Sequence, residues 1–300
     1  MIRMSDNLRG AAFMAGSMTA FTINDGFMKA LADELPLFQA LFLRGLGVVV
    51  CLAVLCRALG QLRFDLGARN WTLIWVRAAA EVGGAYFFLT ALFNMPIANL
   101  SAILQALPLT VALAGALFLG EALGWRRLTA ILIGFCGVLL IVQPGADGFT
   151  VYSLYGLAAV ACITARDLVV RRMTRDVPSV MVALAAAVGV TAFAGAGAAF
   201  IDWAPMTPLA GTQLFSAMVF VIFGYVFSVA AMRTGDIAFI APFRYTSLLV
   251  ALLVGLVVFS EFPGPLALAG AALVVATGLF TLYREARLGR ARRQIAGRLR

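Results

Sequence analysis

The chain has 300 residues, of which 63% are hydrophobic and 12% are charged, and it contains no histidine. A soluble domain needs far more polar surface, so this composition indicates a polytopic membrane protein. The lack of histidine excludes zinc–histidine sites, histidine-ligated haem and histidine acid–base chemistry. A formal net charge of +9 could reflect nucleic-acid binding, but basic cytoplasmic loops of a membrane protein explain it better, and we expect no nucleic-acid partner.

Ten apolar segments follow one another along the chain, each near the roughly 20 residues that span a bilayer as a helix. Arginines precede the first segment, as in a signal peptide, but Asn24-Asp25 within it and the lack of a small-residue cleavage site predict a retained helix. Short connections with turn residues, such as Asn94-Met95-Pro96, make neighbouring helices antiparallel and leave no room for a soluble domain. The predicted helices cover residues 8–31, 37–56, 71–93, 97–119, 126–143, 152–171, 179–201, 212–232, 237–259 and 264–283.

Basic residues orient these helices in the membrane. Eighteen of the 23 lie near the N-terminus, in or at the edges of alternate loops, or in the tail from Arg284 to Arg300. The positive-inside rule therefore predicts that both termini face the cytoplasm. The basic tail could bind a partner, fray, or lie on the anionic inner leaflet. The remaining loops carry acidic charges and no basic ones, as at Asp33, Glu34, Asp147 and Asp202.

The second half of the chain repeats the first at low resolution. Five helices per half is an odd number, so the second half enters the membrane in the opposite sense, and the repeats are inverted about an axis in the membrane plane. This predicts one five-helix repeat over 1–145, a second over 146–284, and a basic tail over 285–300. One set of residues returns at a constant offset: Asn24-Asp25, Lys29 and Pro36 correspond to Arg166-Asp167, Arg171 and Pro178. A second set returns at a slightly shorter constant offset: Ala91, Ile97-Ala98 and Glu121 correspond to Ala231, Ile237-Ala238 and Glu261.

Apart from the arginines at helix ends that are assigned to the cytoplasmic side, eight charged residues fall inside the predicted helices. A charge near the centre of a membrane helix costs about 2.5–3.5 kcal/mol on insertion scales, so such residues point to a polar, functional interior. Alternatively, they form ion pairs within single helices, since Asp25 with Lys29 and Arg77 with Glu81 are spaced i,i+4. The eight are Asp25, Lys29, Arg44, Arg77, Glu81, Arg166, Asp167 and Arg244.

Arg244 is the strongest candidate for ligand binding, because it lies in Pro242-Phe243-Arg244-Tyr245-Thr246. A guanidinium beside aromatic rings can stack on a planar ligand or bind a carboxylate. The alternative is a structural bridge to Glu81 or Asp25 from another helix, and we assign Arg44 no binding role. In the first half, the counterpart of this segment is Leu104-Gln105, followed by Pro108.

Nothing in the sequence predicts a metal site, a cofactor or an enzyme. An intramembrane enzyme commonly needs clustered aspartates with a divalent metal, or a nucleophile with a base, whereas Asp25 and Asp167 stand alone. The cysteines lie in apolar stretches without a C-x-x-C pair, so we interpret them as core residues. They are Cys51, Cys56, Cys136 and Cys162.

Residues 8–283 resemble the drug/metabolite transporter superfamily, in particular its EamA-type ten-helix members. The resemblance rests on Gly120-Glu121 and Ser260-Glu261 after the fourth and ninth helices, and on the stretch from Pro108 to Pro144. Arg9-Gly10, Phe21 to Asp25, and Lys29 resemble bacterial importers of riboflavin or S-adenosylmethionine. The resemblance implies alternating access and a central cavity lined partly by helices 4 and 9, with helices 5 and 10 in assembly. The substrate-binding candidates are Asp25, Glu81, Tyr86, Gln105, Arg244 and Tyr245.

We therefore expect a multi-pass transporter of the bacterial inner membrane that moves a small polar or aromatic metabolite, with riboflavin uptake as the leading hypothesis. The alternatives are an exporter of amino acids or xenobiotics and an importer of S-adenosylmethionine. A purely structural scaffold is disfavoured, because it would have no reason to keep buried charges. The expected partners are the small-molecule substrate and the lipid bilayer. Homodimerisation and coupling to protons remain open.

Overall fold

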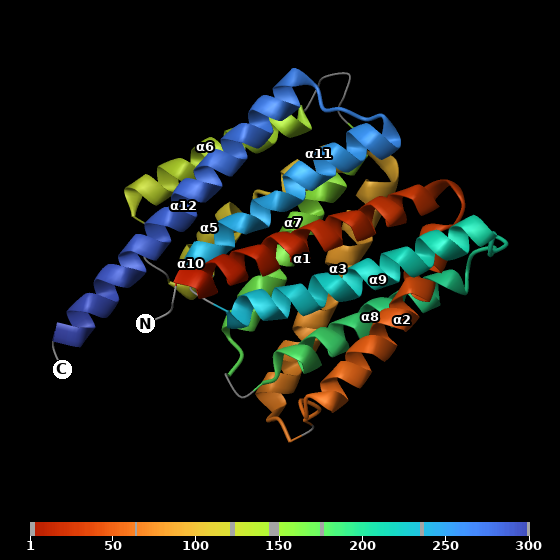
Figure 1. The fold of residues 1–300 in the computed structure, drawn as a ribbon, viewed down its shortest axis with the longest axis horizontal. Coiled ribbons are helices and arrows are strands. Elements are labelled where there is room, and N and C mark those ends of the chain that lie inside the picture. The colour runs from red at the N-terminus through yellow and green to blue at the C-terminus, as the bar shows by residue number, and fades with distance from the viewer. Residues whose placement is uncertain are drawn as a thin grey trace. The chain divides into compact units, whose positions relative to one another are not determined.

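The computed structural model describes residues 4–63, 65–120, 124–143, 150–174, 177–234 and 237–298 (Figure 1). Within these ranges the secondary structure is entirely helical, which confirms the predicted all-α class. In chain order the elements are α1 (Met4–Ala30), η1 (Leu31–Asp33), α2 (Leu37–Ala58), α3 (Ala68–Asn94), α4 (Ile97–Leu104), α5 (Leu107–Leu119), α6 (Trp125–Val142), α7 (Val151–Arg171), α8 (Ser179–Ala198), α9 (Pro208–Arg233), α10 (Ile237–Ile240), η2 (Ala241–Tyr245), α11 (Thr246–Phe259) and α12 (Pro265–Arg298).

Among the described residues, eight helical segments are long and apolar enough to cross a membrane, and α6 adds a shorter apolar helix, Leu128–Val142. The protein is thus a polytopic membrane protein. Helix α1 has 27 residues and is long enough, although Asp25 and Lys29 make it more polar. The count of ten spans, the inverted repeat and the cytoplasmic termini stay predictions. The last predicted helix is longer than expected, because α12 continues through the basic tail to Arg298 (Figure 1).

Two of the predicted helices are interrupted, and they are the fourth of each half. The first breaks at Gln105-Ala106 between α4 and α5, and the second passes from α10 through η2 to α11. A proline follows or lies in each break: Pro108 at the start of α5 and Pro242 in η2. Proline has no N–H to donate and its ring clashes with the carbonyl four residues before it, so proline kinks or breaks a helix.

The ends of these two interrupted helices also correspond. Gly120 after α5 and Ser260 after α11, which are equivalent positions of the repeat, both adopt the left-handed conformation, with φ of 69° and 53°. Their backbone N–H groups donate to the carbonyls of Gly115 and Gly255, which are equivalent at the same offset. Such a cap satisfies carbonyls that the helix end leaves open. The same local geometry therefore occurs at equivalent positions of the two halves.

The chain divides into two compact units that interleave the halves of the sequence. Unit 1 comprises Met1–Thr22, Ser101–Phe149 and Phe223–Arg300, and unit 2 comprises Ile23–Leu100 and Thr150–Ile222. Compactness and internal sequence similarity are different properties, so the repeat boundaries at residues 145 and 284 remain a prediction.

Within unit 1, α6 packs along α12, and α5 contacts both helices (Figure 1). A Cβ on Gly137 of α6 would lie 2.8 Å from the carbonyl oxygen of Gly270 of α12, so the two backbones approach too closely for any larger residue. Small residues allow such close packing of membrane helices. The fifth and tenth predicted helices are thus partners of each other inside this unit.

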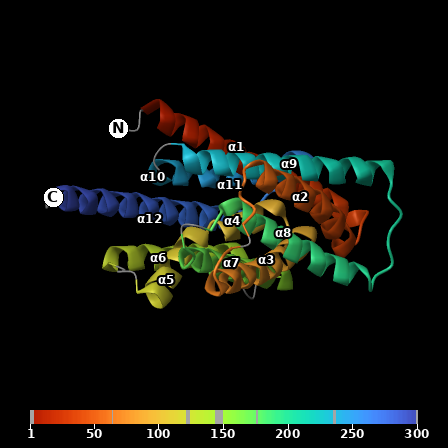
Figure 2. The same ribbon diagram turned by 90° about the horizontal axis from the view of Figure 1, so that it is seen from below.

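Within unit 2, α3 lies against α7 and α8, and α2 lies against α8 (Figure 2). Helix α3 approaches α7 closely at Gly83, where a Cβ would lie 3.0 Å from the Cys162 sulfur. On either side of this glycine, α3 carries Glu81 and Tyr86, two of the predicted site residues. Helix α3 therefore presents both to the interior of the unit.

Candidate functional site

In unit 1, polar groups gather where the two interrupted helices break. Gln105 lies in the break between α4 and α5 and is only 7% exposed. Its Nε2 donates to the Ser247 hydroxyl at 2.8 Å, and that hydroxyl donates to the Arg244 carbonyl at 3.0 Å. The Thr22 hydroxyl of α1 lies 3.5 Å from the Ser247 carbonyl. The structure thus ties both helix breaks together through Gln105 and Ser247.

Arg244 and Tyr245, both predicted site residues, end the 3-10 helix η2 and differ in environment. The Arg244 side chain is exposed, whereas Tyr245 is 8% exposed. The Tyr245 hydroxyl has no hydrogen-bond partner among the described residues. It lies against Gly278 of α12, where a Cβ would overlap it. Gly278 therefore makes room for the tyrosine hydroxyl.

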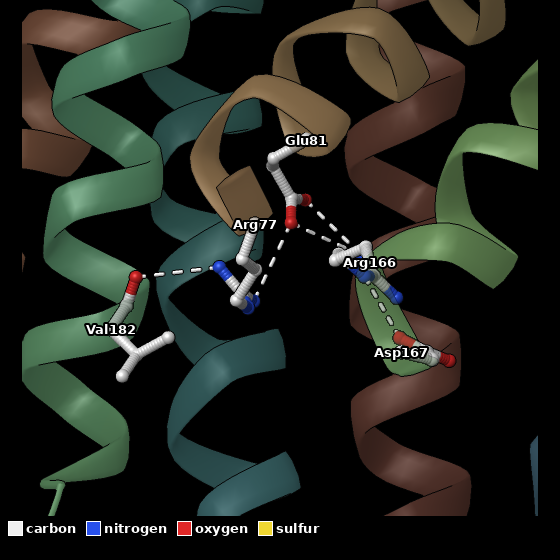
Figure 3. Close-up of polar contacts among 5 residues, drawn as sticks. All are labelled: Arg77, Glu81, Arg166, Asp167 and Val182. Atoms are coloured by element: carbon white, nitrogen blue, oxygen red, sulfur yellow. Dashed lines mark hydrogen bonds and ion pairs between the residues drawn. The ribbon is translucent and has the colours of Figure 1, made fainter. Parts of the chain in front are cut away.

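In unit 2, four charged side chains form one network between α3 and α7 (Figure 3). Arg166 Nη1 lies 3.1 Å from Glu81 Oε1, and Arg166 Nε donates to Asp167 Oδ1 at 2.9 Å. Arg77 Nη2 lies 3.4 Å from Glu81 Oε2, which confirms the predicted i,i+4 pair. Arg77 also donates to the carbonyl of Val182 on α8. Two positive and two negative charges balance here, so the network neutralises itself.

Asp25 lies in a second polar cluster of unit 2, on α1. Asn24 donates from Nδ2 to Asp25 Oδ1 at 2.9 Å, and the Asn24 oxygen accepts from Arg44 Nη1 at 3.1 Å. Lys29 donates to the Met95 carbonyl. Arg44 of α2 thus bridges to Asn24 of α1.

Tyr86 belongs to an aromatic cluster in unit 2. Its ring is stacked on Phe38 of α2, with centroids 6.2 Å apart, and meets Phe193 of α8 edge to face at 5.9 Å. Tyr155 of α7 contacts both Tyr86 and Phe87. Aromatic pairs in such geometries add about 0.5–1.5 kcal/mol each beyond the area they bury. The Tyr86 and Phe87 rings are therefore part of the packing of four helices.

The predicted site residues divide between the units. Unit 1 holds Gln105, Arg244 and Tyr245, and unit 2 holds Asp25, Glu81 and Tyr86. Sequence reasoning missed Ser247; its position three residues after Arg244, on the same polar segment, was the available signal. Of the repeat-equivalent acids, Glu121 lies outside the described residues, and the Glu261 N–H donates to the Gly255 carbonyl.

No group of three or more Cys, Asp or Glu side chains placed to hold a metal ion occurs among the described residues. The four cysteines are free thiols. The chemistry that these clusters can perform is hydrogen bonding, charge pairing and stacking on planar groups.

Known proteins similar to this chain are transporters and exporters. Residues 8–143 match the EamA-like transporter family. The chain is 29% identical to a riboflavin transporter of Vibrio cholerae, covering 96% of this chain and 98% of the relative. It is 24% identical to an S-adenosylmethionine uptake transporter of Rickettsia conorii (93% and 94% covered) and 26% identical to a pseudopaline exporter of Pseudomonas aeruginosa (85% and 89% covered).

A protein of known crystal structure matches over 95% of this chain and 98% of its own, with a TM-score of 0.57 and 24% identity. That likeness concerns the fold alone. The three relatives, by contrast, are named as transporters or exporters, and they span most of the chain. Together with the apolar helices and the match over residues 8–143, they make this membrane protein similar to the EamA-like transporter family.

Proposed function

We propose that the protein is a secondary transporter of the bacterial inner membrane that takes up riboflavin by alternating access. The observation that carries the proposal is the pair of interrupted helices at equivalent positions of the two halves, with Gln105 and Arg244 at the breaks. Broken helices at corresponding positions mark the binding site of many transporters built from inverted repeats. The similarity to the Vibrio cholerae riboflavin transporter, over nearly the full length of both chains, supports riboflavin as the substrate.

The proposed site uses the residues predicted from the sequence. In unit 1, the Arg244 guanidinium would stack on the flavin ring, and Gln105 and Tyr245 would hydrogen-bond to it. Asp25 and Tyr86, both in unit 2, stay in the proposal as substrate-binding residues predicted from the sequence. Glu81 is already engaged by two arginines, so in this proposal it shapes the site by holding them.

The proposal includes ten membrane spans, in two inverted repeats over residues 1–145 and 146–284, with both termini cytoplasmic. The alternation of basic and non-basic loops supports this orientation. The equivalent proline breaks and left-handed caps of the fourth helix in each half support the repeat.

Uptake of labelled riboflavin by a riboflavin-auxotrophic bacterium tests the proposal. Cells that express the protein should accumulate riboflavin, and Arg244→Ala should reduce uptake at least tenfold if the guanidinium stacks on the ring. Arg69→Ala, at an exposed arginine near the start of α3, is the matched control and should leave uptake unchanged. Equal uptake by the wild type and Arg244→Ala would remove Arg244 from the site.

Uptake of S-adenosylmethionine is the second candidate, and the Rickettsia relative favours it. The same cells assayed with labelled S-adenosylmethionine separate the two functions. Export is the third candidate, in line with the Pseudomonas aeruginosa relative. An exporter of amino acids or xenobiotics would confer resistance on overexpression without improving vitamin uptake.

A further inference from the structure

The hydroxyl group of Ser247 makes two hydrogen bonds of opposite sense. It donates to the Arg244 carbonyl at 3.0 Å, and it accepts from Gln105 Nε2 at 2.8 Å. A serine hydroxyl has a single hydrogen to donate, and the backbone carbonyl of Arg244 can only accept. With its hydrogen donated to the Arg244 carbonyl, Ser247 meets Gln105 as an acceptor.

This constraint sets the orientation of the Gln105 side-chain amide. The nitrogen faces Ser247, since a carbonyl oxygen in its place would require the hydroxyl to turn its hydrogen away from the Arg244 carbonyl and break that bond. Gln105 is 7% exposed, so water offers little compensation for the wrong orientation. The amide therefore has a defined polarity: Oε1 and the second N–H of Nε2 point away from the Ser247 bond as an acceptor and a donor side by side.

The two residues lie where a ligand would meet both interrupted helices. Gln105 occupies the break between α4 and α5, and Ser247 lies in the first turn of α11, directly after η2. Arg244, three residues before Ser247, has an exposed side chain. A planar ring stacked on that guanidinium would present its edge to neighbouring groups on the same segment.

We propose that Ser247 is a positioning residue that fixes the Gln105 amide and thereby selects planar heterocycles with a hydrogen-bond donor and acceptor side by side on one edge. This inference rests on the proposed function and deepens it. The flavin ring has such an edge in its imide, where N3–H adjoins the C4 carbonyl. The adenine of S-adenosylmethionine has one in its N6 amino group and N1. Both edges would pair with Gln105 in the same sense, with the ring donor to Oε1 and the ring acceptor from Nε2.

The test compares riboflavin with N3-methylriboflavin, which lacks the imide donor, in the wild type, Ser247→Ala and Ser247→Thr. In the wild type the analogue should have a KM at least about tenfold higher, the worth of one good hydrogen bond. Ser247→Ala should raise the KM of riboflavin about tenfold and leave that of the analogue unchanged, so the ratio falls toward 1. Ser247→Thr keeps the hydroxyl and should restore the ratio.

Ser17→Ala is the matched control. It removes another serine hydroxyl of unit 1 that donates to a backbone carbonyl, that of Gly224, at 2.8 Å. A loss of fold or expression would lower uptake of both compounds equally, and KM ratios are independent of the amount of protein. The Ser17→Ala ratio should equal that of the wild type.

The outcomes separate this inference from the proposed function. If riboflavin is taken up but the wild type does not discriminate against the analogue, or if Ser247→Ala keeps the discrimination, the inference is wrong and the proposed function stands. If only S-adenosylmethionine is taken up, the same comparison with its N6,N6-dimethyl analogue, which lacks the donor, decides the inference. If neither compound is transported, the proposed substrates and this inference are both wrong.

Discussion

Replacing Arg166 by glutamine should destabilise the protein, because this side chain holds two carboxylates from two helices. Arg166 Nη1 lies 3.1 Å from one Glu81 oxygen and donates to the other at 3.3 Å, while Nε donates to Asp167 at 2.9 Å. With Arg77, the network has two charges of each sign. The substitution leaves a net charge of −1 in the interior of unit 2, with Arg77 alone to compensate two carboxylates.

The cost follows from burial. The side chains of Arg166, Glu81 and Asp167 are 22%, 24% and 31% exposed. Breaking a fully buried pair by removing one partner costs about 3–5 kcal/mol, whereas an exposed pair is worth about 0–1 kcal/mol. At roughly a quarter exposure we expect about 2–4 kcal/mol, toward the buried limit. In a thermal scan of the detergent-solubilised protein, Tm should fall by about 5 °C or more.

A double-mutant cycle tests the reasoning. Arg166→Gln, Glu81→Gln and the double variant should show a coupling energy above about 1 kcal/mol, since residues in one charged network are not additive. The Arg63–Asp65 pair is the matched control, with a similar 2.9 Å contact but side chains that are 47% and 66% exposed. Arg63→Gln should barely change Tm. Additive effects of Arg166→Gln and Glu81→Gln, or an equal loss in Arg63→Gln, would refute the argument.

Two further substitutions probe packing. Gly278→Ala should lower Tm by several degrees, because the new Cβ would overlap the Tyr245 hydroxyl. Gly211→Ala is the control: it lies in a helix with nothing within 4 Å of the added Cβ, so the free energy of unfolding should stay the same or rise by about 0.5–1 kcal/mol. Equal Tm values for the two variants would contradict this. Gln39→Leu should lower the free energy of unfolding by about 2–3 kcal/mol, because the buried Gln39 amide pairs with both the N–H and the carbonyl of Ala204 at 2.9 Å. A thermal scan in which Gln39→Leu has the same Tm as the wild type would contradict this.

The boundaries of the helices were largely predictable from sequence. The apolar run predicted over 71–93 is α3, Ala68–Asn94, and the run over 152–171 is α7, Val151–Arg171. The prediction works because a bilayer requires an uninterrupted apolar stretch of known length, which is a local property. The breaks within the fourth helix of each half were not predicted, although Pro108 and Pro242 were visible. Proline is tolerated in many membrane helices, so its presence alone does not locate a break.

The candidate site was predictable only in part, and the charged network shows the limit. The pair Arg77–Glu81 follows from the i,i+4 spacing within one helix, and the structure confirms it. The contact of Glu81 with Arg166, on a helix of the other half of the chain, does not follow from spacing. From the sequence, Arg166 was only one of eight charges inside predicted helices and Glu81 was a separate binding candidate, whereas the structure joins the two side chains.

The sequence by itself determined that the chain is an all-helical membrane protein, where its apolar segments lie, and which charges fall inside them. These follow from composition, hydrophobic length and helical spacing, all of which act between residues near one another in the chain. Only the tertiary structure decided which helices pack together and which polar groups meet, as Gln105 and Ser247 do. Contacts between helices depend on how side chains of distant segments fit, and glycine positions such as Gly83 and Gly137 control that fit through the distance between two backbones.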